Sequence, residues 1–151
     1  MTAILLAIHL LAAVFWVGGM AFAYMILRPA AGALPPEQRL PLWRRVFARF
    51  LPWVGAAIVA LLVSGFWMIF HPFGGFAGLP LYINLMMGLG IVMMLLYLHL
   101  LFAPWKRFRI AADAGSWPEA ATQLNKIRAT VGINLILGAI TLAIGASGRY
   151  W

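Results

Sequence analysis

Four long apolar stretches dominate the chain and are separated by short polar connections. They cover residues 3–27, 51–70, 81–103 and 129–147. About 20 apolar residues are enough to cross the hydrocarbon core of a bilayer as an α-helix. The pattern therefore predicts an all-α protein, a four-helix transmembrane bundle that forms a single domain over residues 1–151.

The first stretch has two distinct faces when it is read at 3.6 residues per turn. One face carries His9, Ala12, Ala13, Trp16, Gly19 and Met20, and the opposite face carries Leu11, Phe15, Phe22 and Ile26. In lipid, small and ionisable residues face neighbouring helices and bulky apolar ones face the acyl chains. We therefore expect this helix to point His9 and Trp16 into the bundle.

The other three stretches also contain stripes of small and polar residues that predict inward faces. In the second stretch the stripe is Trp53, Ala56, Ala60, Ser64, Trp67 and His71. In the third it is Asn84, Met87, Gly88, Ile91, Leu95 and His99. In the fourth it is Thr130, Asn134, Gly138, Thr141, Gly145 and Gly148. On this prediction all three histidines of the chain face the bundle interior.

Composition and charge support the membrane prediction and suggest an orientation. The chain is 65% hydrophobic and 9% charged, against about 25% charged residues in soluble domains. Its net charge is +8, and the basic residues gather in the connections 28–50 and 104–128, whereas the connection 71–80 has none. The positive-inside rule then places both basic connections in the cytoplasm and both termini in the periplasm of a bacterial inner membrane. The expected partner of the basic side is anionic lipid, not nucleic acid.

The basic connections have helical patterns of their own. Pro35, Pro36 and Glu37 are typical of a helix start. The following residues Leu40, Trp43, Phe47 and Phe50 share one face. This pattern predicts a short interfacial amphipathic helix that runs into the second stretch. In the other connection, residues 116–119 have the form of a capping box.

Several classes of chemistry are absent from the sequence. Without cysteine, the chain cannot form disulfides, thiolate metal sites or covalent haem links. Its three acids, Glu37, Asp113 and Glu119, all lie in the basic connections. The stretches therefore offer no paired carboxylates and no hydrolytic triad, and the pattern favours a protein that is not an enzyme.

Helix rise indicates which histidines can meet. At 1.5 Å per residue, His9 and Met87 both lie about 9 Å inside the outer edge, and His71 caps the second stretch at that edge. His99 lies about 18 Å deeper than His9. Imidazole and thioether ligands suit copper, especially Cu(I). The sequence thus predicts an outer copper site formed by His9, His71 and Met87.

Two alternatives remain open at this point. One is a b-type haem site with His9 and His99 as candidate ligands and Trp16 as a wall of the pocket, because histidine and methionine also ligate haem iron. The other is an accessory subunit whose small-residue faces bind a larger membrane protein complex.

The motifs around these residues resemble a known family. The segment 9–20, from His9 through Trp16 to Met20, and the segment 27–30 resemble the opening of CopD-type membrane proteins (copper resistance protein D). Residues 86–90 and 102–105 are similar to later parts of short members of that family. The resemblance implies a four-helix bundle with a role in copper uptake or tolerance, with a periplasmic copper carrier as a candidate partner.

A more distant resemblance is to HemJ-type protoporphyrinogen oxidases, which are small haem-binding helical bundles. Their first helix has a similar pattern of histidine followed by Trp-x-Gly, and a histidine falls late in their third helix, as His99 does here. Their acidic element before the last helix would fall near residues 128–130, where this chain has no acid. The resemblance implies haem binding but not the same oxidase chemistry.

Overall fold

The computed structural model describes residues 1–150, and these residues form helices joined by short loops. The first helical run comprises α1 (Thr2–Phe22), the π-helical turn η1 (Ala23–Leu27) and α2 (Arg28–Gly32). It is followed by α3 (Pro36–Phe70), α4 (Leu81–Phe102), α5 (Pro104–Asp113), α6 (Trp117–Ser147) and the short 3-10 turn η2 (Gly148–Tyr150). Four of these runs are long and apolar enough to cross a membrane. The predicted all-α architecture with four spans is therefore confirmed.

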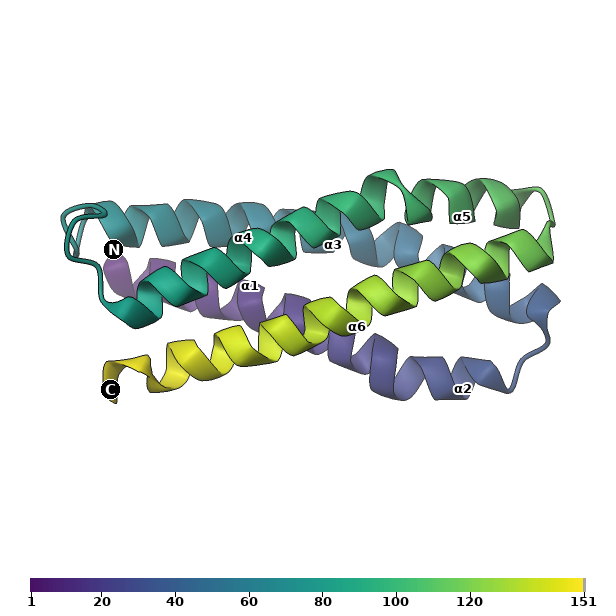
Figure 1. Ribbon diagram of the computed structural model, residues 1–151, viewed down its shortest axis with the longest axis horizontal. Helices are drawn as coiled ribbons and strands as arrows, with labels where there is room; N and C mark the ends of the chain where they lie inside the picture. The colour runs from purple at the N-terminus through teal and green to yellow at the C-terminus, as the bar shows by residue number, and fades with distance from the viewer. Residues whose placement is uncertain (151) are drawn as a thin grey trace.

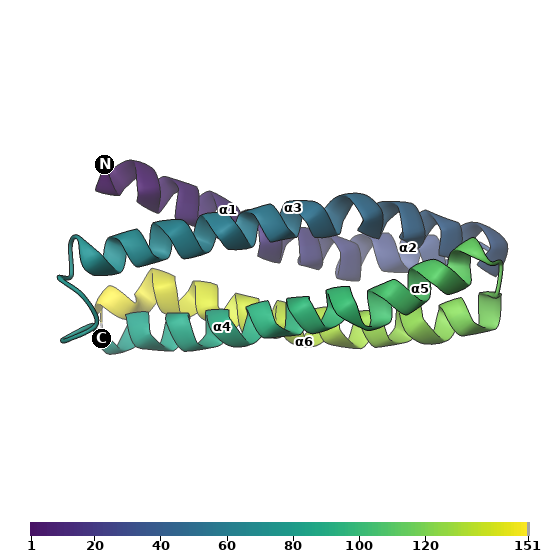
Figure 2. The same ribbon diagram turned by 90° about the horizontal axis from the view of Figure 1, so that it is seen from above.

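The long helices form two layers. In Figures 1 and 2, α1 and α3 lie side by side in one layer, and α4 and α6 pair in the other. Both termini and the loop 71–80 lie at one end of the bundle, which we call the terminal end. The short connections 33–35 and 114–116 lie at the opposite end, which we call the connection end. Predicted cytoplasmic arginines therefore gather at the connection end.

Glycines on α6 allow the helices to approach closely. A Cβ added at Gly138 would lie 2.7 Å from Val17 Cγ2 on α1 and 3.1 Å from Met93 Cε on α4. A Cβ at Gly145 would lie 2.8 Å from Met86 Cε. Small residues at helix crossings are typical of membrane bundles because they let backbones pack together. The predicted inward stripe of the fourth stretch is confirmed, with Asn134, Gly138 and Gly148 buried.

The predicted faces of the first stretch are also confirmed. Ala12, Trp16 and Met20 are buried on α1, whereas Leu11 and Phe15 on the opposite face are exposed. On α3, Ser64 is buried as predicted, but Trp53 at the other end of the predicted stripe is 66% exposed. The buried face of α3 instead continues through Leu51, Val54 and Ala57.

The predicted inward face of the third stretch is wrong. Ile91 and Leu95 are 48% and 59% exposed, and Asn84 and His99 lie on the same outer face of α4. The buried residues of α4 are Met93, Tyr97 and Leu100. The reason is that the polar side chains of α4 differ in where their hydrogen-bond partners lie. The Asn84 amide bonds the carbonyl of Leu79 near its own helix start, whereas the Tyr97 hydroxyl donates across the bundle to the carbonyl of Leu51 at 2.9 Å.

The amphipathic segment before the second stretch is helical and runs into that stretch, as predicted. Residues 36–50 form the first part of α3 without a break at Pro41 or Pro52. Their apolar face packs against α5, where the Phe47 ring lies 6.0 Å from Trp105 and 6.4 Å from Phe108. Arg44 pairs with Asp113 of α5 at 3.1 Å. The aromatic side chains of this segment are thus buried against α5.

Candidate functional site

His9 lies between α1 and α3 and is partly buried. Its ring nitrogen Nδ1 is 2.8 Å from the hydroxyl oxygen of Ser64, which is 1% exposed. A Cβ added at the neighbouring Gly65 would lie 3.3 Å from His9 Cε1. The absence of a side chain at Gly65 therefore lets the imidazole lie against α3. The prediction that His9 faces the bundle interior is confirmed.

The hydrogen bonds around Ser64 are compatible with a His9 tautomer that has its hydrogen on Nδ1. The Ser64 hydroxyl donates its one proton to the carbonyl of Ala60, at 2.5 Å. When that proton stays on the carbonyl, the oxygen accepts the bond from the ring and Nδ1 of His9 carries the hydrogen. In a neutral imidazole the other nitrogen, Nε2, then keeps its lone pair. This is the protonation pattern of a metal-binding histidine whose second nitrogen is held by a hydrogen bond.

His71 lies at the end of α3 and is exposed at the terminal end of the bundle. Its imidazole stacks on the Trp67 ring, with centroids 3.7 Å apart and planes 9° from parallel. His71 follows Ser64 by seven residues, or two helical turns, so both lie on the same side of α3 and about 10 Å apart along its axis. The structure thus places His71 above His9 on one stripe, at the rim of the bundle.

Met87 lies at the depth of His9. Ser64 is six residues before the end of α3, and Met87 is six residues after the start of α4, so both lie about 9 Å from the loop that joins these helices. The Met87 side chain is half-buried, whereas Met86 turns toward Gly145 of α6. Because α4 packs mainly against α6 and α5, and the contacts of α1 are mainly with α3, the role of Met87 as a partner of His9 stays a prediction.

The remaining candidates occupy different environments. His99 is exposed on the outer face of α4, so the expectation that it faces the interior near Asn134 is wrong. Asn134 instead donates to the carbonyl of Met93 at 3.3 Å. Trp16 is 3% exposed and meets Tyr97 edge-on, with centroids 6.5 Å apart. Trp16 thus belongs to the hydrophobic core, and its role as a cofactor wall stays a prediction.

Within residues 1–150, no group of three or more histidine, cysteine, aspartate or glutamate side chains could hold a metal ion.

Sequence reasoning missed two features. It placed Ser64 on an inward stripe but did not identify it as the partner of His9. It also did not bring together Arg28, Arg39 and Arg128, which line one pocket at the connection end.

Comparison with known proteins identifies the family. A family model described as Copper resistance protein D (CopD) matches residues 44–147, a segment that contains His71, Met87 and His99 and begins after His9. No curated protein and no solved structure matches the chain. Since the matched segment is more than half of the chain and lies within a bundle of four apolar helices, this multi-pass membrane protein belongs to the CopD family.

Proposed function

We propose that the protein takes up or relays copper through two stations in the terminal half of the bundle. His71 at the exposed rim is the first station, and His9 in the interior, at the depth of Met87, is the second. The observation that carries the proposal is the 2.8 Å contact between His9 Nδ1 and Ser64 Oγ, because an imidazole that is held through one nitrogen can bind a metal through the other.

The chemistry of the stations favours Cu(I) as the cargo. An imidazole nitrogen and a thioether sulfur are both neutral ligands, and the thioether selects soft ions. The stations are about 10 Å apart along α3, so one ion cannot bind both histidines at once. Transfer would therefore proceed by ligand exchange from His71 to the deeper site. The exposed position of His71 suits delivery by a periplasmic copper carrier.

The membrane orientation is part of the same proposal. The basic connections at one end of the bundle favour a cytoplasmic location for that end, which leaves the terminal end with His71 in the periplasm. A bacterial inner membrane is the compartment in which this orientation gives a periplasmic carrier access to the rim.

Copper retention by histidine variants tests the proposal. The purified protein in nanodiscs is loaded with Cu(I), washed against a Cu(I) chelator and analysed for metal. We expect the wild type to retain copper, His9→Ala to lose it and His71→Ala to load more slowly. His99→Ala is the matched control, because His99 is exposed on the outer face of α4, and it should behave as wild type.

Three results would contradict the proposal. They are copper retention in His9→Ala equal to that of the wild type, equal loss in His99→Ala, and no retention in the wild type. An absorption spectrum of the protein as purified tests the alternative of a b-type haem site. A Soret band that shifts on reduction with dithionite would assign the site to haem. A protein that holds neither group would fit an accessory subunit.

A further inference from the structure

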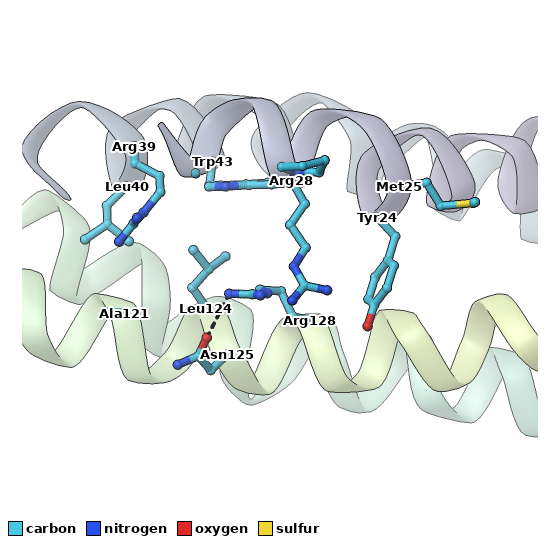
Figure 3. Close-up of a pocket in the computed structure, with 12 residues that line it drawn as sticks. Tyr24, Met25, Arg28, Arg39, Leu40, Trp43, Ala121, Leu124, Asn125 and Arg128 are labelled. Atoms are coloured by element: carbon cyan, nitrogen blue, oxygen red, sulfur yellow. Dashed lines mark hydrogen bonds between the residues drawn. The ribbon is translucent and has the colours of Figure 1, made fainter. Parts of the chain in front are cut away.

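A pocket of about 540 Å³ lies at the connection end, away from His9 and His71. Its walls come from three parts of the chain. Figure 3 shows Tyr24 and Arg28 reaching from the first helical run toward α6, with Arg128 on α6 facing Arg28. Arg39 and Trp43 enter from α3. The pocket is therefore formed by residues far apart in the sequence.

The pocket concentrates positive charge without a counter-charge. It is lined by Arg28, Arg39 and Arg128, and none of its lining residues is acidic. In the described part of the chain, the ion pair of Arg44 and Asp113 lies elsewhere. Neutral partners fix two of the three guanidinium groups. Arg128 donates to Asn125 Oδ1 at 3.1 Å, and Arg28 lies 4.9 Å from the centre of the Tyr24 ring.

Like charges held together by neutral partners favour an anionic ligand. Each guanidinium presents a planar set of N–H donors that matches the oxygens of a phosphate and can bind it through two bonds. The hydrogen bond of Arg128 to Asn125 and the contact of Arg28 with the Tyr24 ring orient these groups in advance. Binding an anion would relieve the repulsion among the three cations.

Backbone geometry helps to form the pocket. The chain widens into the π-helical turn η1 immediately before Pro29, where the Arg28 amide bonds the carbonyl of Ala23. A proline within a helix removes a donor and crowds the carbonyl four residues earlier, and a wide turn relieves that conflict. Tyr24 and Arg28 both belong to this segment, so the wide turn aims them at α6.

The surroundings of the arginines indicate an amphiphilic ligand. Arg28 directly follows the first apolar stretch, and the neighbouring Met25, which also lines the pocket, is 70% exposed. Leu40 and Leu124 add apolar wall. The pocket thus lies at the boundary between apolar and basic surfaces, which is where the phosphates of a lipid bilayer are found.

We propose that this pocket binds an anion with two phosphate groups, of the kind that a diphosphatidylglycerol headgroup presents. The three guanidinium groups carry three positive charges, and a single phosphodiester carries only one negative charge. A headgroup with two phosphates should therefore bind more tightly than one with a single phosphate. This site is independent of the copper stations, because its residues lie at the opposite end of the bundle.

Native mass spectrometry of the full chain tests the site by counting bound lipid. The protein is reconstituted in zwitterionic lipid with added diphosphatidylglycerol or phosphatidylglycerol. We expect the lipid with two phosphates to bind more tightly, and Arg128→Gln to weaken its binding roughly tenfold or more, because hydrogen bonds to charged groups are lost. Arg45→Gln removes the same charge from an exposed position outside the pocket and should leave binding unchanged.

A second arm decides the source of the phosphate. Inorganic pyrophosphate is added in purely zwitterionic lipid, and its binding is measured by calorimetry in the wild type and both variants. Tight pyrophosphate binding that Arg128→Gln abolishes would support the phosphate site and assign it to a soluble ligand. If Arg128→Gln lowers helix content, Arg39→Gln replaces it. Equal effects of the pocket and control variants, or no preference for two phosphates over one, would overturn the proposal.

Discussion

Replacing Ser64 with alanine tests how the bundle prepares His9. The change removes one oxygen atom from a position that is 1% exposed, and with it the hydrogen-bond partner that lies 2.8 Å from His9 Nδ1. The ring can then rotate or exchange its tautomer, so Nε2 is no longer held ready for the metal. Loss of a hydrogen bond that orients a metal-binding histidine typically lowers metal affinity 10- to 100-fold. This corresponds to about 1.4–2.7 kcal/mol of binding free energy.

The expected effect on folding is smaller than the effect on binding. Hydrogen bonds between membrane helices contribute about 0.6 kcal/mol on average. Ser64→Ala should therefore fold normally, with a thermal midpoint close to that of the wild type. The control is Ser147→Ala, which removes an exposed hydroxyl that bonds the carbonyl four residues earlier, as Ser64 also does.

Competition with a chromophoric Cu(I) chelator measures the affinities of the wild type, Ser64→Ala and Ser147→Ala. We expect Ser64→Ala to bind Cu(I) more weakly than the wild type and Ser147→Ala to bind it with the affinity of the wild type. Unchanged copper affinity in a folded Ser64→Ala protein would refute the role of Ser64 in orienting His9. An equal loss in both variants would show that the effect is general to the bundle.

Two further predictions concern packing and orientation. Gly138→Ala should destabilise the bundle by about 1–3 kcal/mol, because its new Cβ would lie 2.7 Å from the stiff side chain of Val17. Gly88→Ala should stabilise the bundle by about 0.5–1 kcal/mol, because nothing lies within 4 Å of the added Cβ and alanine favours a helix over glycine. Thermal unfolding in detergent compares the two, and a Gly138→Ala protein at least as stable as the Gly88→Ala protein would contradict the packing. Since the chain has no cysteine, Ala77→Cys and Ala114→Cys give single labels at opposite ends of the bundle. A thiol reagent that cannot cross the inner membrane should label only Ala77→Cys in intact cells, and the reverse pattern would invert the orientation.

The sequence predicts the four spans from their length and hydrophobicity. It also predicts the inward face of the first helix, because small and polar residues lie on one face of that helix and bulky apolar residues on the other. On α1, one histidine and several small residues contrast with bulky apolar ones, and His9 and Trp16 lie inside as predicted. On α4 almost every position is apolar, so hydrophobicity hardly distinguishes its faces. The few polar residues then mislead, because Asn84 satisfies its amide locally and His99 lies on the outer face.

The features that the sequence did not predict depend on contacts between segments that are far apart in the chain. The bond between His9 and Ser64 depends on the register of α1 against α3, which Gly65 permits by leaving room for the ring. The arginine pocket depends on three helices whose cations are separated in the chain. Periodicity assigns a residue to a face of its own helix, but it does not give the partner of that face.

X-ray absorption at the copper edge of the Cu(I)-loaded protein tests the interior station most directly. We predict nitrogen and sulfur scatterers around the metal in the wild type, loss of the nitrogen contribution in His9→Ala and loss of the sulfur contribution in Met87→Leu. Copper surrounded only by oxygen or nitrogen, or a spectrum that neither substitution changes, would show that His9 and Met87 do not hold the ion.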